Sequence, residues 1–232
     1  MSNKPLVSII MSTYNAENTL AKSLDSIINQ TYENIEILIM DDCSDDLSYQ
    51  ILKDYESNFS NVHIYKNSIN LGLTKSLNIL INKSNGDLIA RQDSDDTSTR
   101  QRIEKQVKVI KDENLDFCTT RAIRDNSNKK IPGLSFNLPT KLVMKFKNPF
   151  IHGSLMVKKL LILKNGLYDE NFYYAQDYKL FYDLLKVKAK FKVINEPLYH
   201  LSMENNISTR NKEVQQYYAN CVKKNQIPEL RK

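Results

Sequence analysis

Glycine is scarce in this sequence and tryptophan is absent. Only 5 of the 232 residues are glycine. They form neither G-x-G-x-x-G nor G-x-x-x-x-G-K-[ST], the two patterns whose backbone amides cradle phosphate groups. The sequence therefore excludes a glycine-rich phosphate loop of either kind. A phosphate bound by this protein needs another partner, such as a metal ion.

Cysteine, histidine and long apolar runs are also few. The three cysteines are far apart and match neither a disulfide framework nor a zinc motif, which indicates reduced thiols. The three histidines are dispersed and predict no local metal motif. No apolar run approaches the roughly 20 residues of a membrane-spanning helix, and the first five residues do not resemble a signal peptide. We therefore expect a cytoplasmic protein.

The charge balance is moderately basic, with 33 Lys and Arg against 27 Asp and Glu. The basic residues are mixed with acidic ones and form no RRM, zinc-finger or helix-turn-helix signature, so we expect no nucleic-acid partner. Lysines are frequent in the second half of the chain. They are compatible with a solvated surface or with a face held against an anionic membrane. These lysines are Lys141, Lys145, Lys147, Lys158, Lys159, Lys186, Lys188, Lys190 and Lys192.

Strand and helix patterns alternate through the first hundred residues. Apolar runs predict strands and helical spacing of apolar residues predicts helices. The strands are expected at 6–11, 35–40, 62–65 and 88–90, and the helices at 17–30, 47–55 and 73–81. This alternation implies an α/β fold with a mostly parallel central sheet flanked by helices.

The second half is less regular, and no linker or internal repeat divides it from the first. We expect one domain over residues 1–232. Its second half is expected to contain helices at 103–110 and 178–187, strands at 116–124, 154–157 and 191–194, and a polar loop or lid at 125–139.

Polar clusters follow three of the predicted strands, at residues 12–15, 41–42 and 93–96. Ligands of open parallel sheets bind beyond the carboxyl ends of the strands. The alternative is that these residues form turns and helix caps. That alternative suits the third cluster poorly, because three carboxylates within four residues repel one another unless a cation lies among them. An Asp-x-Asp after a strand is consistent with a site for Mg²⁺ or Mn²⁺ and a diphosphate.

Several longer motifs occur in a recognisable order. They are VSIIMSTYN at 7–15, SIINQTY at 26–32, EILIMDDCSDD at 36–46, NLGLTKSLN at 70–78, Gly86-Asp87, IARQDSDD at 89–96 and RIEKQ at 102–106. In this order they resemble the inverting glycosyltransferases of family 2, over almost the whole chain from about Pro5 to Thr209. The resemblance implies the GT-A (Rossmann-like) fold. It also divides the domain into a nucleotide-sugar-binding half (about 1–100), an acceptor-binding half (about 101–209) and a basic C-terminal tail (210–232).

The resemblance also assigns roles to individual residues. The nucleotide sugar would be bound by Ser12, Tyr14, Glu17, Asp42, Arg91 and Asp93. Asp95, with Asp93, would coordinate the divalent cation. Arg91 has the alternative role of a salt-bridged strand residue.

A catalytic base and an acceptor side are implied as well. The segment YYAQD at 173–177 resembles the motif that carries the base, which would be Asp177; the alternative role for Asp177 is a helix N-cap. His152 and Gln176 would lie on the acceptor side. Gln176 replaces the glutamate usual in the family, and Met203 stands where many members carry a histidine near the metal. These two departures leave open a catalytically inactive nucleotide-sugar-binding accessory protein as an alternative function.

The resemblance implies transfer of a hexose or N-acetylhexosamine from a nucleoside diphosphate sugar, expected to be a UDP-sugar. The acceptor would be a hydroxyl of a growing bacterial capsule, O-antigen or lipooligosaccharide glycan, free or linked to a lipid diphosphate. A protein acting on such an acceptor would be cytoplasmic, with peripheral contact at the inner face of the membrane.

Overall fold

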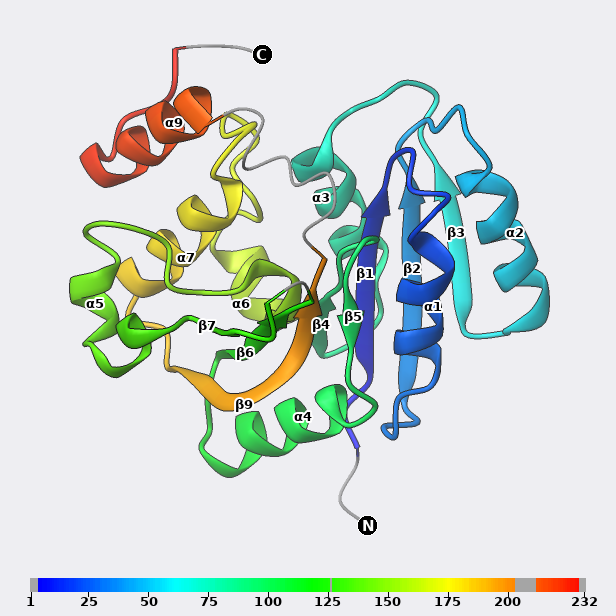
Figure 1. Cartoon of the computed structure of the whole chain (residues 1–232), viewed down its shortest axis with the longest axis horizontal. Helices are drawn as coiled ribbons and strands as arrows, with labels where there is room; N and C mark the ends of the chain where they lie inside the picture. The colour runs from blue at the N-terminus through cyan, green and yellow to red at the C-terminus, as the bar shows by residue number, and fades with distance from the viewer. Residues whose placement is uncertain (1–3, 126, 203–211, 230–232) are drawn as a thin grey trace.

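The computed structural model describes residues 4–125, 127–202 and 212–229. Its first half is the predicted alternation of strands and helices (Figure 1). The elements are β1 (Val7–Thr13), α1 (Leu20–Ile28), β2 (Ile35–Asp41), α2 (Ser48–Asn58), β3 (Val62–Lys66), α3 (Leu73–Lys83) and β4 (Leu88–Arg91). The four strands pair in parallel in the order β3-β2-β1-β4.

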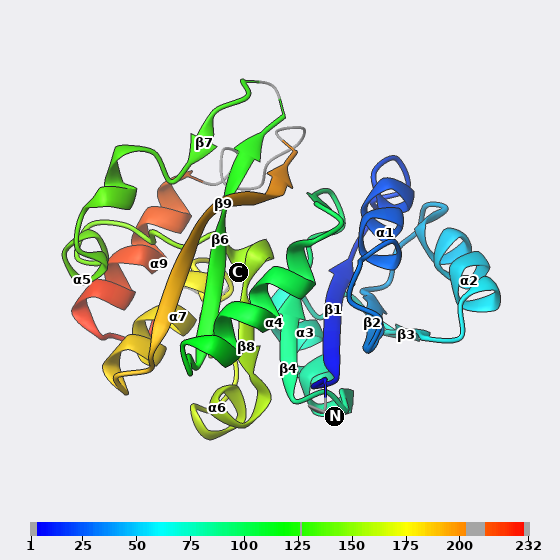
Figure 2. The ribbon, with the colours of Figure 1, turned by 90° about the horizontal axis from the view of Figure 1, so that it is seen from below.

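The second half extends the same sheet, in the order β4-β8-β6-β9-β5, with β7 paired to β6. β8 is antiparallel to both β4 and β6, whereas β6 and β9 run parallel and lie side by side (Figure 2). The strands are β5 (Thr97–Ser98), β6 (Phe117–Arg124), β7 (Lys130–Ile131), β8 (Met156–Lys158) and β9 (Phe191–Leu201).

Helices and short helical turns connect these strands. They are α4 (Arg102–Asp112), η1 (Leu134–Asn137), α5 (Thr140–Val143), η2 (His152–Ser154), α6 (Lys159–Lys164), α7 (Gln176–Lys186) and α9 (Lys212–Lys224). None of the helices in the described part of the chain is both long and apolar enough to span a bilayer.

The sheet has a hydrophobic layer on each face. Val7 and Ile9 of β1 both belong to the cluster formed with α1, α2 and α4, whereas Ile10 belongs to the cluster formed with α3, α7 and α9. Successive side chains of a strand point to opposite faces. Because both faces are covered, the central strands are continuous apolar runs instead of alternating ones.

A buried polar network lies near the starts of β1 and β2. The predicted site lies at the other end of these strands. Ser8 donates a 2.5 Å hydrogen bond to Glu36 Oε1 on the neighbouring strand, and the same oxygen accepts from the backbone N–H groups of Asn85 and Gly86. Burial raises the pKa of Glu36, but these donors outweigh it and hold the pKa below its ordinary value. Gly86 has no room for a side chain, because a Cβ there would lie 2.5 Å from Ser8 Oγ.

The predicted fold class is confirmed, but several predicted bounds differ from the structure, and three of these differences have a clear physical reason or consequence. α1 begins at Leu20, three residues late, because the N–H of Ala16 is bonded to the Ser48 hydroxyl and holds residues 14–19 in a turn. The predicted loop at 125–139 contains β7 and η1. β9 continues to Leu201, well beyond residue 194, because its pairing with β6 shifts register and exposes polar residues that interrupt the sequence pattern.

Candidate active site

The polar clusters leave the sheet at one edge. Thr13 at the end of β1 lies opposite Asp41 at the end of β2. β4 ends at Arg91, and the next N–H, from Gln92, donates a 3.1 Å hydrogen bond to the carbonyl of Ile10 on β1. The segments that follow the three strands therefore start side by side: 14–17, 42–46 and 93–96.

The loops after β1 and β2 are joined by hydrogen bonds. The N–H of Asn15 donates to Ser44 Oγ at 3.1 Å, and the N–H of Leu47 donates to Glu17 Oε2 at 2.9 Å. The carboxylate of Glu17 thus holds the start of α2. Tyr14, between these contacts, has half of its surface exposed (51%). Of these two predicted nucleotide-sugar residues, Tyr14 presents an aromatic face to solvent and Glu17 holds the loop beneath it.

Asp42 connects β2 to the loop before α3. Its Oδ1 accepts hydrogen bonds from Asn67 Nδ2 at 2.7 Å and from the N–H of Leu71 at 2.8 Å, and its Oδ2 accepts from the N–H of Gly72 at 2.8 Å. The side chain is buried. Three of its lone pairs are therefore used within the protein. This geometry gives Asp42 the task of holding the loop before α3 against the end of β2.

Thr13 and Asp41 belong to the predicted polar clusters, but the sequence assigned neither of them an individual role. Both are buried, and Thr13 Oγ1 and Asp41 Oδ1 have no hydrogen-bond partner among the described residues. Asp41 Oδ2 accepts from the N–H of Ser44 at 3.3 Å and lies 3.7 Å from Lys66 Nζ. Buried polar atoms without a partner are uncommon in proteins. The edge therefore retains unused hydrogen-bonding capacity between β1 and β2.

Asp93 is held on several sides. Arg91, which is buried, forms an ion pair with Asp93 Oδ1, and the charge of Asp93 raises the pKa of Arg91 against the lowering effect of burial. The hydroxyl of Tyr199 lies 3.0 Å from the N–H of Asp93 and accepts its hydrogen bond. Gly153 packs against the same carboxylate, because a Cβ there would lie 2.5 Å from Asp93 Oδ2. Both roles considered for Arg91, support of the cluster and a salt bridge, are combined in this one ion pair.

Arg102 is a second buried arginine at this place, and sequence reasoning did not select it. Its Nη1 donates to the carbonyl oxygens of Arg91 at 2.9 Å and Gly153 at 2.8 Å, and its guanidinium lies 5.3 Å from the ring centre of Tyr199. Burial lowers its pKa to about 10. Arg102 is the first residue of the RIEKQ motif, so the motif itself carried the signal.

The next two carboxylates differ in exposure. Asp95 is exposed at the surface, yet desolvation by its surroundings and the charge of Asp93 raise its pKa to about 6. Asp96 is buried, and its Oδ1 accepts from the N–H of Ser202 at 2.8 Å. Burial, Asp93 and Asp95 together raise the pKa of Asp96 to about 9. Burial, together with repulsion between neighbouring carboxylates, thus favours the protonated forms of Asp95 and Asp96.

Such a set of carboxylates fits a hard divalent cation. Mg²⁺ and Mn²⁺ prefer oxygen ligands and are commonly held by one or two carboxylates together with substrate phosphates. Asp93 Oδ2 and the exposed carboxylate of Asp95 are such ligands, and a cation beside them would relieve the repulsion that raises the pKa of Asp95. No group of three or more His, Cys, Asp or Glu side chains in the described residues is arranged to hold a metal alone. The protein would therefore share the cation with its substrate.

His152 and Tyr168 form a polar pair in the second half of the chain. His152 Nε2 is 2.8 Å from the hydroxyl of Tyr168. Burial and the charge of Arg91 lower the pKa of His152 to about 4, and the carboxylates of Asp177 and Asp93 both act against that shift. Burial raises the pKa of Tyr168, and the same two carboxylates contribute to its rise. The charges of Asp93 and Asp177 therefore both reach this pair.

Asp177 lies in the first turn of α7, next to Gln176, the first residue of that helix. Asn148 Nδ2 donates a 2.7 Å hydrogen bond to Asp177 Oδ2. The N-cap of the helix is Ala175, in the left-handed region at φ +53°, so Asp177 is not the cap. A carboxylate in this position is stabilised by the helix dipole and by Asn148.

The predicted residues thus fall into two groups along this edge. Ser12, half-buried on β1, Tyr14, Glu17 and Asp42 belong to the β1 and β2 side, and Arg91, Asp93, Asp95, His152, Gln176 and Asp177 belong to the β4 and α7 side. Met203, aligned with the histidine of other members, lies outside the described residues.

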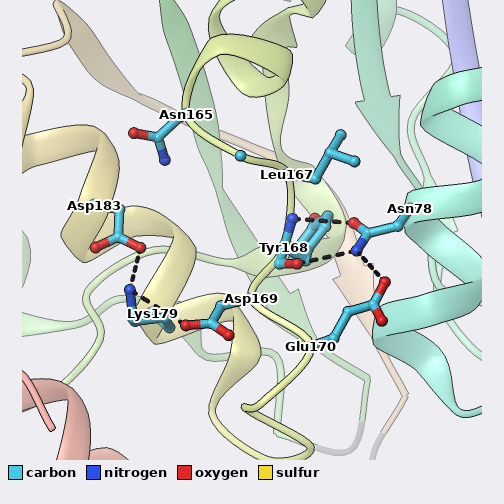
Figure 3. A pocket seen from close by; sticks show the side chains of 9 residues that line it. Asn78, Asn165, Leu167, Tyr168, Asp169, Glu170, Lys179 and Asp183 are labelled. Carbon is cyan, nitrogen blue, oxygen red and sulfur yellow. Dashed lines mark hydrogen bonds and ion pairs between the residues drawn. The ribbon is translucent and has the colours of Figure 1, made fainter. Parts of the chain in front are cut away.

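A pocket of about 370 Å³ lies beside Tyr168 and includes none of the predicted site residues. Figure 3 shows Asn78 reaching the backbone of Tyr168 and Glu170, and Lys179 between Asp169 and Asp183. Its charged groups are therefore engaged with one another. These contacts connect α3 to α7 and hold the helix that carries Asp177.

With this geometry described, the chain can be compared with known proteins. It matches the profile of Glycosyl transferase family 2 over residues 8–169. The O-antigen biosynthesis glycosyltransferase WbnJ of Escherichia coli is 34% identical over 187 residues, covering 78% of this chain and 72% of WbnJ. The uncharacterized glycosyltransferase MJ1057 of Methanocaldococcus jannaschii is 33% identical over 225 residues, covering 93% of this chain and 77% of MJ1057. The chain belongs to glycosyltransferase family 2.

Solved structures agree on the fold. S. aureus TarS 1–349 in complex with UDP-GlcNAc superposes with a TM-score of 0.77 at 19% identity, over 89% of this chain and 61% of that one. The mannosyltransferase PcManGT of Pyrobaculum calidifontis, in complex with GDP-Man and Mn²⁺, superposes with a TM-score of 0.74 at 16% identity, over 93% and 62%. The fold is GT-A. The chain spans 58% to 77% of the length of four curated relatives that it matches.

Proposed function

We propose that this protein is a metal-dependent, inverting glycosyltransferase that moves a hexose or N-acetylhexosamine from a nucleoside diphosphate sugar, a UDP-sugar, to a glycan hydroxyl. The observation that carries the proposal is the placement of Asp93 and Asp95 directly after β4, at the carboxyl end of the parallel strands, where the buried Arg91 holds Asp93 and the carboxylate of Asp95 is exposed. Family membership supports the reaction class.

The donor would lie along the edge formed by β1, β2 and β4. Tyr14 offers an exposed ring to the nucleoside, Ser12 and the partnerless oxygens of Thr13 and Asp41 offer polar contacts, and Asp42 holds the adjoining wall. Asp93 and Asp95 would hold the Mg²⁺ or Mn²⁺ ion. When bound, such an ion supplies positive charge against the departing diphosphate. Arg91 keeps Asp93 oriented and contributes a fixed positive charge nearby.

Asp177 would act as the general base. It accepts the proton of the acceptor hydroxyl while that oxygen forms a bond to the anomeric carbon. The bond from the anomeric carbon to the diphosphate oxygen breaks on the opposite face, so the configuration inverts. Asn148 orients the carboxylate by occupying one oxygen, and His152 and Gln176 line the acceptor side. His152, whose pKa lies at about 4, is neutral at physiological pH and does not compete for the proton.

The acceptor in this proposal is a growing bacterial capsule, O-antigen or lipooligosaccharide glycan, free or linked to a lipid diphosphate. The naming of WbnJ as an O-antigen biosynthesis enzyme supports this class. The same proposal includes a nucleotide-sugar-binding half (about 1–100), an acceptor-binding half (about 101–209) and a basic tail (210–232). It also includes a cytoplasmic location at the inner face of the membrane.

The test is sugar transfer and UDP release by the full chain, with a panel of UDP-sugars, Mn²⁺ and a cell-derived glycan acceptor. Asp95→Ala and Asp177→Asn should each lower kcat by at least about a hundredfold, since each removes a group that acts in the transition state. Asp54→Asn, which removes an exposed carboxylate of α2, is the matched control and should retain activity. EDTA should stop turnover.

Donor binding, followed by thermal shift, separates this proposal from the alternative. Asp177→Asn should still bind the UDP-sugar, because the base contributes to the reaction and not to donor affinity. Donor binding by the wild type without UDP release at any acceptor would instead indicate the non-catalytic accessory protein. Full activity after metal stripping would contradict the metal dependence.

A further inference from the structure

One stretch of the surface combines exposed apolar side chains with helical turns. Between residues 134 and 147, four large apolar side chains reach solvent: Leu134 (90% exposed), Leu138 (52%), Leu142 (45%) and Phe146 (70%). Leu134 and Leu138 lie at the two ends of η1, whereas Leu142 lies in α5 and Phe146 just beyond it. Several exposed large apolar side chains in one short segment mark an interaction surface. We call residues 134–147 the docking segment.

The inner side of the docking segment is packed against the rest of the protein. Val143 and Met144 are buried, and the hydroxyl of Tyr178 on α7 donates a hydrogen bond to the carbonyl of Met144. The N–H groups of Phe146 and Lys147 both donate to the carbonyl of Val143 at 2.9 Å. These contacts fix which side faces inward. The outward exposure of Leu142 and Phe146 is therefore a property of the packed structure and not of a loose loop.

The charge of this region has one sign. The sequence has no acidic residue between Asp125 and Asp169. All charged residues of the docking segment and of residues 129–133 just before it are lysines, and each of them is exposed. They are Lys129, Lys130, Lys141, Lys145 and Lys147. Apolar side chains enter a membrane interface while lysines reach lipid phosphates, and each such lysine adds to the affinity for anionic lipid. The combination fits an anionic bilayer, whose acyl chains take up apolar side chains and whose lipid phosphates supply counter-charges for the lysines.

The position of the docking segment relative to the site is favourable for a lipid-borne acceptor. Asn148, which holds Asp177 at 2.7 Å, follows the segment directly in the chain. Figures 1 and 2 both place α5 at the edge of the molecule remote from α2. The docking segment thus lies on the side of the acceptor half, and the nucleotide-sugar half is remote from it.

We propose that the docking segment seats this protein on an anionic phospholipid membrane, with the four apolar side chains in the interface and the lysines on the lipid phosphates. Its purpose, delivery of Asp177 to a lipid-linked acceptor, rests on the proposed function. The docking itself does not depend on sugar transfer, and the experiment below uses neither donor nor acceptor.

The experiment is flotation of the full chain with vesicles of pure phosphatidylcholine and with vesicles that contain phosphatidylglycerol. The wild type should float with the anionic vesicles and remain behind with the neutral ones. Leu134→Ser/Phe146→Ser and Lys141→Glu/Lys145→Glu should each lower the partition coefficient by about tenfold or more. Lys108→Glu/Lys111→Glu on α4 makes the same change in net charge, and Leu160→Ser on α6 removes an apolar side chain of similar exposure; both should bind as the wild type does.

Each other outcome contradicts the proposal. Equal losses in the α4 and docking-segment charge variants would mean that net charge alone attracts the protein to vesicles. No flotation of the wild type with either vesicle would exclude membrane docking. A dimeric wild type that becomes monomeric in Leu134→Ser/Phe146→Ser would assign the surface to a second copy of the chain. Circular dichroism of each variant reports whether the fold is retained. If the wild type floats as expected but transfers no sugar, the proposed function is wrong and the docking stands.

Discussion

Asn148 and Asp177 are 29 residues apart in sequence and joined by a 2.7 Å hydrogen bond from Nδ2 to Oδ2. The N–H of Phe150 donates in turn to Asn148 Oδ1 at 3.0 Å, which fixes the orientation of the amide. Oδ2 of Asp177 is thereby occupied. Because the carboxylate is rigid, holding Oδ2 also fixes the direction of Oδ1. This arrangement makes Asn148 a positioning residue for the proposed base.

We expect Asn148→Ala to lower kcat by about tenfold or more, because a hydrogen bond to a charged group contributes about 1.5–3 kcal/mol and only the orientation of Asp177 depends on it. The KM for the UDP-sugar should change little. Steady-state kinetics with the donor varied separate the two effects. Asn58→Ala, at the exposed end of α2, is the control. A rise in donor KM with kcat unchanged would show that Asn148 serves the donor instead.

Gly153 supports a second prediction, at the opposite wall of the site. A methyl group there would overlap the hydroxyl of Tyr199 and lie 2.5 Å from Asp93 Oδ2. Gly153→Ala should therefore displace Asp93 and lower kcat by at least about a hundredfold, since small misplacements of reacting groups carry such costs. Activity and the melting temperature should be measured together.

Gly133→Ala provides the comparison, because nothing lies within 4 Å of a Cβ at that position. Its ψ of −124° lies outside the regions that alanine favours, so this variant should lose some stability without displacing a residue of the candidate site. This variant should retain wild-type activity. If Gly153→Ala is as active as Gly133→Ala, the packing against Asp93 has no part in the reaction.

The sequence allowed the first half of the fold to be predicted well, because each strand there is a buried apolar run followed by an amphipathic helix. It also led to the candidate site residues through the family resemblance, and these stay predictions. What it concealed depends on long-range contacts. β9 pairs with β6 through a register shift that breaks its alternation. Arg102 donates hydrogen bonds to two backbone carbonyls, and Asn148 donates one to a carboxylate, from segments distant in the sequence. Glu17, which was predicted to bind the nucleotide sugar, accepts a hydrogen bond from the N–H of Leu47.

Glu36 leads to a prediction about stability and pH. Its pKa is lowered in the folded protein from an ordinary value of 4.5, because the hydrogen bonds from Ser8, Asn85 and Gly86 outweigh burial. A lowered folded-state pKa contributes stability that is complete above pH 4.5 and is lost as the pH falls through the folded-state value. We expect Glu36→Gln to lower the free energy of unfolding by about 2 kcal/mol at pH 7.

The difference between Glu36→Gln and wild type should shrink as the pH falls below 4.5, because the wild-type carboxylate then becomes protonated. Urea denaturation at pH 7, 5 and 3.5 measures this trend. Glu104→Gln, a glutamate of the first turn of α4 whose carboxylate accepts only from the exposed hydroxyl of Thr31 among the described contacts, is the control. A difference that stays constant over this range would exclude a charged Glu36 as the source of the stability.

Cys43 allows the nucleotide edge to be tested without a mutation. It directly follows Asp42, is half-buried and adopts the left-handed conformation at φ +67°. Cys118 and Cys221 are buried, and burial raises the pKa of Cys118 to about 12, so its reactive thiolate is negligible at pH 8. A thiol reagent should therefore modify Cys43 first. If the UDP-sugar lies along β1 and β2, UDP with Mn²⁺ should slow that reaction severalfold, as followed by intact-mass spectrometry. UMP at the same concentration, which lacks the diphosphate, should protect less. Equal rates with and without UDP would exclude this edge as the nucleotide site.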